Sequence, residues 1–150
     1  MALFEPFTFY QTEKRVNDAV ISDAIENLEE RDLPKMFFRA PYVPPYSESS
    51  LVKTFQRRSA YRPFHDEARR QKIAVIYLSE WIGHEKEEHL EKFIKFLYDY
   101  HAFFHFTYYF VAERATKEEA RDMYKLLTEY LGEGRTAKYK KKTVCEKEGN

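Results

Sequence analysis

The feature that most constrains the fold of this chain is a run of six apolar residues at 73–78, Ile-Ala-Val-Ile-Tyr-Leu. A strand that is apolar on both faces is typical of the centre of a parallel sheet, which helices cover on both sides. A second buried strand, rich in aromatic residues, is predicted at 103–111. The apolar run is far shorter than the roughly 20 residues that cross a bilayer. The chain therefore predicts a layered α/β fold, and no membrane partner is expected.

Helical patterns alternate with these strands, because apolar residues recur at every third or fourth position between them. Thr12 is the expected N-cap of the first helix. Thr116 and Glu119 have the spacing of a capping box, in which each side chain satisfies the other residue's backbone N–H. Four helices are predicted at 12–30, 47–59, 84–100 and 116–131.

Three shorter segments complete the predicted order of elements. Residues 35–43 are predicted to form a brief strand that ends near Arg39 or Ala40, because Pro41 cannot donate to a sheet ladder. Pro63 is placed to open a short helix, and residues 137–145 are read as a last strand or a loose tail. The alternation predicts a three-layer αβα fold with a mostly parallel sheet of about four strands.

The length of 150 residues suits one domain. We divide the chain into an N-terminal aromatic arm (1–11), a single α/β domain (12–134) and a basic C-terminal strand or tail (135–150). The N-terminus lacks the basic start and apolar core of a signal peptide. Cys145, the single cysteine, excludes an intramolecular disulfide, so a reducing cytoplasm is expected.

The order of elements resembles the core of a P-loop (AAA-like) ATPase over residues 12–145. The sequence IAVIYLSEW at 73–81 is similar to a Walker B strand, and residues 103–113 resemble the sensor strand that follows it. The sequence IENLEERDLPKMFFRAPYV at 25–43 looks like the first helix leading into the second strand. The first strand of the family is missing from this match.

The chain departs from that family at its chemical motifs. It contains no GxxxxGK[ST] phosphate loop, and no glycine precedes Gly83. Ser79 occupies the position of the magnesium-binding Asp, while Glu80 matches the catalytic carboxylate. Ala112-Glu113 stands where the sensor strand would end in a neutral polar residue. The resemblance therefore implies a degenerate relative that does not hydrolyse ATP and needs no cofactor.

Glu80 and Glu113 are the candidate catalytic residues, because each follows a central strand at the edge where parallel sheets bind ligands. Facing one crevice, they would form an acid/base pair or a metal clamp. The structural alternative, which we favour, has Glu80 capping a loop and Glu113 pairing with Arg114 in solvent. The histidine pairs 84/89 and 101/105 do not have zinc-site spacing, so no metal is expected.

Two basic segments interrupt a chain of formal net charge +0. Residues 53–72 include seven basic and two acidic residues, interleaved with aromatic ones. Residues 134–150 include six basic and two acidic residues. Such segments either contact nucleic-acid phosphates or pair with the acidic residues at 85–91 of the same fold. The second interpretation is favoured. The candidate nucleic-acid-binding residues are Arg57, Arg58, Arg62, Arg69, Arg70, Lys140, Lys141 and Lys142.

The chain is also rich in aromatic residues, with 13 Phe and 12 Tyr. Exposed aromatic clusters mark protein interfaces, and a small sheet has limited core space. Phe37, Phe38, Tyr42 and Tyr46 are therefore candidate protein-binding residues. The alternative is that these segments bury themselves against the domain's own surface.

These observations predict a non-catalytic α/β binding module that acts through a macromolecular partner, in the first place a protein. The first alternative is nucleic-acid binding through 53–72 and 135–147. The second is a small-molecule enzyme with a carboxylate pair at the carboxyl edge of the sheet. A homodimer through edge strands at 35–43 or 137–145 is left open.

Overall fold

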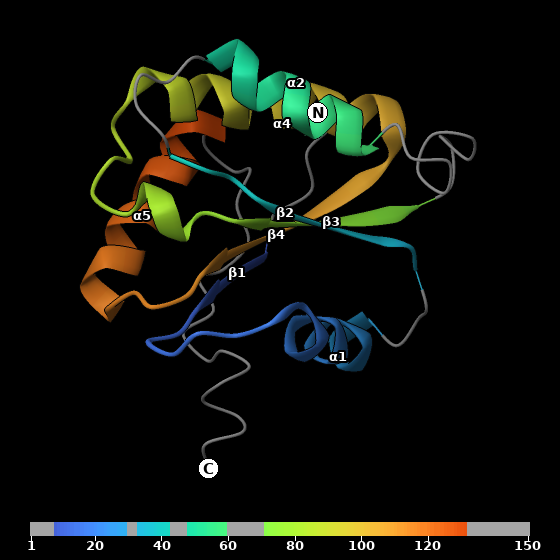
Figure 1. Cartoon of the computed structure of the whole chain (residues 1–150), viewed down its shortest axis with the longest axis horizontal. Helices are drawn as coiled ribbons and strands as arrows, with labels where there is room; N and C mark the ends of the chain where they lie inside the picture. The colour runs from blue at the N-terminus through green and yellow to red at the C-terminus, as the bar shows by residue number, and fades with distance from the viewer. Residues whose placement is uncertain (1–7, 30–32, 43–47, 60–70, 132–150) are drawn as a thin grey trace.

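The computed structural model describes residues 8–29, 33–42, 48–59 and 71–131 of the chain (Figure 1). Its elements are β1 (Thr8–Gln11), α1 (Asp18–Glu29), β2 (Lys35–Arg39), α2 (Glu48–Ser59), β3 (Lys72–Tyr77), the short 3-10 helix η1 (Ser79–Trp81), α4 (Glu88–Phe104), β4 (Phe106–Ala112) and α5 (Lys117–Leu131).

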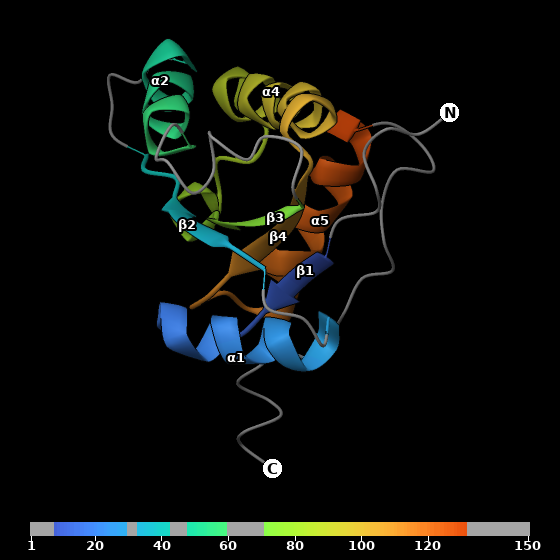
Figure 2. The same cartoon turned by 90° about the vertical axis from the view of Figure 1, so that its right-hand side faces the viewer.

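The four described strands form one sheet in the order β1-β4-β3-β2, and every pair is parallel. Helix α1 covers one face of this sheet, whereas α2, α4 and α5 cover the other (Figures 1 and 2). The predicted three-layer α/β fold with a parallel sheet is confirmed. Within the described residues, no helix is long and apolar enough to cross a membrane.

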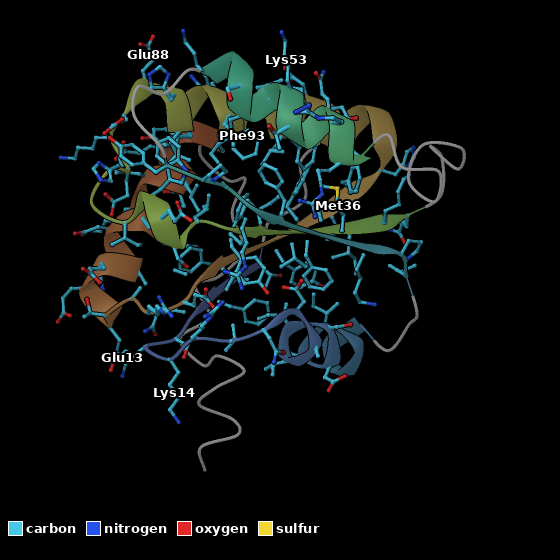
Figure 3. The ribbon with its side chains drawn as sticks, in the orientation of Figure 1. Glu13, Lys14, Met36, Lys53, Glu88 and Phe93 are labelled. Atoms are coloured by element: carbon cyan, nitrogen blue, oxygen red, sulfur yellow. The ribbon has the colours of Figure 1, made fainter. Side chains whose placement is uncertain are left out.

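The side chains of the central strand β3 alternate between two hydrophobic cores, one on each face of the sheet. Ala74 and Ile76 point into the core beneath α2, α4 and α5, while Ile73 and Val75 point into the core beneath α1. All of β3 is buried, as the apolar run that begins at Ile73 predicts, and Lys72 at its start is buried as well. Figure 3 shows Met36 on the neighbouring strand and Phe93 on α4 in the layer between the sheet and the helices.

Aromatic rings fill the larger core, and Phe55 of α2 lies among them. Its ring centroid is 5.5 Å from Phe38, 6.0 Å from Phe93, 5.3 Å from Tyr100 and 6.2 Å from Phe106, all in edge-on arrangements. Aromatic pairs at this separation stabilise a core beyond the area that they bury. Much of the aromatic content of the chain is therefore core.

The start of the chain differs from its prediction. Residues 8–11 lie within the segment expected as an arm, yet they form the edge strand β1 against β4. The backbone N–H of Thr12 extends this pairing by donating to the Ala112 carbonyl, 3.1 Å away. Thr12 is therefore not the N-cap. Helix α1 begins at Asp18, and the Asn17 side chain accepts the Val20 N–H at its N-terminus.

The helix predicted at 84–100 begins and ends four residues later than expected. Residues 84–87 form turns instead, with backbone hydrogen bonds from His84 to Trp81 and from Glu87 to His84. At the other end, α4 continues to Phe104, and His105 turns the chain in a left-handed conformation with φ 59°. Strand β4, predicted at 103–111, therefore starts at Phe106. The elements predicted at 63–70 and 137–145 lie outside the described residues.

Candidate functional site

The carboxyl ends of the four parallel strands meet at one edge of the sheet. There, β1 leads into α1 on one face, while its neighbour β4 leads into α5 on the other. Ligands of parallel α/β sheets bind beyond such a point, where neighbouring strands connect to opposite faces. Glu113, directly after β4, lies at this point of the molecule.

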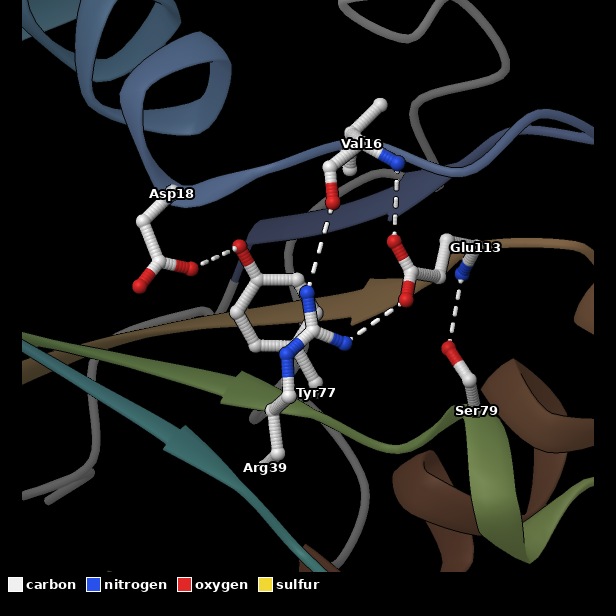
Figure 4. A network of polar contacts seen from close by, with 6 residues as sticks. All are labelled: Val16, Asp18, Arg39, Tyr77, Ser79 and Glu113. Carbon is white, nitrogen blue, oxygen red and sulfur yellow. Dashed lines mark hydrogen bonds and ion pairs between the residues drawn. The ribbon is translucent and has the colours of Figure 1, made fainter.

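Glu113 is buried, with 4% of its surface exposed, and both carboxylate oxygens are occupied (Figure 4). Oε1 accepts the backbone N–H of Val16 at 2.9 Å, and Oε2 lies 2.6 Å from Nη1 of Arg39. The backbone N–H of Glu113 donates to Oγ of Ser79 at 2.9 Å. One side chain thus joins the ends of β2 and β4 to the β1–α1 loop.

Arg39 reaches Glu113 across the end of β3. Its guanidinium carbon lies 3.8 Å from the centre of the Tyr77 ring, and Nη2 donates to the Val16 carbonyl at 3.3 Å. The Tyr77 hydroxyl donates to Oδ1 of Asp18 at 2.8 Å. Burial and this hydrogen bond to Asp18 raise the pKa of Tyr77 well above its usual value, so the phenol stays protonated at alkaline pH values at which an exposed tyrosine ionises.

A surface hollow of about 680 Å³ adjoins this network, lined by residues 15–19 and Arg39. It combines two arginines, Arg15 and Arg39, with the N-terminus of α1, a combination that favours anions. Asp18, however, brings its own carboxylate into the lining. Arg15 and Arg39 thus face one Asp18 carboxylate in the lining, and Arg39 is itself paired with Glu113.

Glu80 belongs to a second group of contacts. Its Oε1 accepts the backbone N–H of Tyr42 at 3.0 Å. The Tyr42 hydroxyl donates to Oε2 of Glu87 at 3.0 Å, and Nδ1 of His84 lies 3.0 Å from the same oxygen. The Tyr42 ring stacks on His84 at 3.9 Å and meets Trp81 edge-on at 5.0 Å. The hydrogen bond to Glu87 raises the pKa of Tyr42.

The two candidate carboxylates bind residues that pack against different faces of the sheet. Glu113 binds Val16, which belongs to the core beneath α1, whereas Glu80 binds Tyr42, which packs against the opposite core. No described residue bonds to both carboxylates in these networks. Glu113 also pairs with Arg39 rather than with Arg114, the partner we had weighed.

Three of the acidic residues expected to neutralise the basic segment, Glu87, Glu88 and Glu91, have other partners. Glu88 pairs with Lys92 at 3.2 Å and Glu91 with Lys95 at 2.9 Å, both within α4. Glu87 binds Tyr42 and His84, as described above.

The basic residues themselves have several environments. Arg57 and Arg58 are exposed on α2, and Nη2 of Arg58 donates to the Phe37 carbonyl at 2.7 Å. Lys72 is fully buried, with Nζ 5.5 Å from the centre of the Phe106 ring. The candidates outside the described residues are Arg62, Arg69, Arg70, Lys140, Lys141 and Lys142.

The candidate protein-binding aromatics do not form one exposed patch. Phe38 is buried in the core, and Phe37 packs half-buried against the core beneath α1. Tyr42 is held by the contacts described above, and Tyr46 lies outside the described residues.

Sequence reasoning did not single out Arg39, Tyr77 or Asp18 as members of a network. One signal was available for Arg39, a charged residue at the predicted end of a strand, where side chains from neighbouring strands converge. In the described part of the chain, no group of three or more His, Cys, Asp or Glu side chains has the arrangement of a metal site. Comparison with known protein families, curated proteins and solved structures found no match to this chain.

Proposed function

We propose that this protein is a non-catalytic α/β binding module that acts through a macromolecular partner. The observation that carries the proposal is that both carboxylate oxygens of Glu113 already have partners within the protein. Glu113 lies at the edge of the sheet where the neighbouring strands β1 and β4 lead to opposite faces. A general base needs an oxygen within reach of a substrate proton. Both oxygens of Glu113 instead hold Val16 and Arg39, and little of the side chain is exposed.

Glu80 supports the same proposal. It is exposed, but its carboxylate holds the chain that follows β2, through the Tyr42 N–H. Its partner Tyr42 packs against the opposite core from Val16, the partner of Glu113, so each carboxylate is engaged in a separate set of contacts. A small-molecule reaction that needs both groups is therefore the weaker alternative.

We further propose kinship with P-loop ATPases as a degenerate relative. A phosphate loop follows a strand and precedes a helix. The corresponding segment here, residues 12–17 between β1 and α1, is Thr-Glu-Lys-Arg-Val-Asn. It has neither the glycines that let backbone amides surround a phosphate nor the Gly-Lys-Ser/Thr ending.

The proposal is tested by assaying the full chain for hydrolysis of ATP in the presence of magnesium. We expect phosphate release no faster than in buffer. The assay is repeated with Glu80→Gln and Glu113→Gln, with the exposed Glu118→Gln of α5 as the matched control. Hydrolysis that is lost in either of the first two variants and kept in the control would show an enzyme and overturn the proposal.

Affinity purification of the tagged chain from its source cells, with and without nuclease, tests the second half of the proposal. A binding module retains a macromolecule at a fixed ratio in at least one of the two conditions. Recovery of the chain alone in both conditions would contradict it.

A further inference from the structure

We infer that the exposed face of α2 binds the phosphate backbone of double-stranded nucleic acid. The inference rests on the proposed function, because it names the partner of a binding module. It is carried by exposed cations of α2 that form no ion pair within the described residues, on a helix whose exposed side chains at 50–59 are all polar.

Lys53 and Arg57 are exposed and four residues apart, so they lie on one side of the helix, about 6 Å apart along its axis. Figure 3 shows Lys53 on the outer side of α2, away from the sheet. Neither side chain forms an ion pair within the described residues. Arg58 adds a third cation, held at the edge of β2 by its bond to the Phe37 carbonyl.

Helix α4 packs beside α2 but does not cancel this charge. Its acids Glu88 and Glu91 form ion pairs with lysines of the same helix. Asp99 is the one exposed acid of α4 that has no ion pair in the described part of the chain. The positive charge of α2 is therefore left facing solvent, where it attracts a polyanion.

The composition of this surface favours nucleic acid over an acidic protein. Over residues 50–59, the part of α2 whose side chains are described, the exposed residues are Ser50, Lys53, Gln56, Arg57 and Arg58, none of them apolar. Protein interfaces need an apolar or aromatic centre, whereas protein–DNA interfaces are more polar and more positive.

The position of Phe55 decides which part of the nucleic acid is bound. Single-stranded nucleic acid is held by stacking bases on aromatic side chains. Phe55, the aromatic residue of α2, is fully buried in the core and is not available for stacking. The face of α2 therefore contacts phosphates, which repeat every 3.4 Å of helix axis along each strand of a duplex, without reading the sequence.

The test measures fluorescence anisotropy of a labelled DNA duplex of mixed sequence against the full chain. If three cations contact phosphates, raising the salt from about 50 to 200 mM weakens binding roughly 40-fold. The variant Lys53→Gln/Arg57→Gln keeps one contact, so its affinity is expected to fall only about 3.5-fold over the same range. The native chain and the variant are also compared on a single strand of one of the two sequences, which is expected to bind more weakly than the duplex.

The matched control is Arg121→Gln/Lys125→Gln on α5. This pair is also exposed and four residues apart, and it removes the same charge, but it lies among Glu118, Glu119 and Asp122. Its salt dependence is expected to equal that of the native chain. Thermal melts of both variants show that each is folded.

Equal effects of the two double variants would overturn the inference, because net charge alone would then account for the binding. Absent or salt-independent duplex binding would overturn it as well. A protein retained after nuclease treatment by both the native chain and Lys53→Gln/Arg57→Gln would refute the inference but leave the proposed function standing. Carboxylate-dependent ATP hydrolysis would refute the proposed function, whatever the duplex does.

Discussion

Nη1 of Arg39, at the end of β2, lies 2.6 Å from Oε2 of Glu113, which follows β4, so the pair joins two strands that β3 separates. Glu113 is buried, while the Arg39 side chain is 42% exposed. The pair therefore links β2 and β4 at the carboxyl edge of the sheet, with the Glu113 carboxylate buried and the Arg39 guanidinium at the surface. The energetic cost of breaking it should depend on which partner is removed.

Arg39→Ala leaves a buried carboxylate without its cation, and we expect the free energy of unfolding to fall by about 2 kcal/mol, less than for a fully buried pair. Glu113→Gln keeps an oxygen for the Val16 N–H and should cost about 1 kcal/mol. Urea denaturation measures both, with Arg114→Ala as the exposed control. Equal stability of Arg39→Ala and the native chain would show that the pair is not structural.

Tyr77→Phe should make stability less sensitive to alkaline pH. The pKa of Tyr77 is raised in the folded chain, so folding retains a proton that the unfolded chain releases above about pH 10. The contribution of Tyr77 is therefore complete below that pH and is lost as pH rises toward the folded pKa. Urea denaturation at neutral pH and above pH 10 compares the two chains. An identical loss of stability in both would contradict this prediction.

Phe55→Ala removes the ring that five aromatic neighbours surround, and we expect a loss of about 3–5 kcal/mol in the free energy of unfolding. Phe37→Ala, at a half-buried site, is the control and should cost less. Thermal or urea denaturation gives the comparison. A larger loss for Phe37→Ala would place the centre of packing on the α1 side.

Thr116→Ala should destabilise the N-terminus of α5 by about 1 kcal/mol. The capping box predicted from the sequence is present, with Glu119 N–H donating to the Thr116 hydroxyl at 3.1 Å and Thr116 N–H donating to Glu119 at 2.9 Å. Thr128→Ala, within the same helix, is the control and is expected to have a smaller effect. The difference in urea midpoint between the two variants is the measurement.

Local patterns in the sequence predicted the elements whose structure is decided locally. The apolar run at 73–78 gave a central strand because burial on both faces imposes a composition that few other elements share. The capping box depends on residues three positions apart and was predicted for the same reason. Helix α4 begins only after Glu87, whose side chain accepts a hydrogen bond from Tyr42, a contact from outside the helix that no local pattern contains.

The network at the carboxyl edge was not predictable in the same way. Arg39 and Glu113 are paired by the strand order, which no local pattern contains. The strand β1 was missed because its four residues become a strand only through hydrogen bonds to β4. The burial of the basic residues at 53–72 was not predictable from local sequence either. Only the structure shows that Lys72 is buried whereas Arg57 is exposed.

The pairing of Thr8 with Tyr109 has a consequence for how the chain reaches its native state. Of the described strands, β1 is synthesised first, and nearly all the rest of the described chain must follow before its partner β4 exists. Strands β2, β3 and β4 follow one another in sequence and are neighbours in the sheet, so they can assemble first. Because closing a long loop costs entropy before its contacts form, docking of β1 is expected to be a late and slow step.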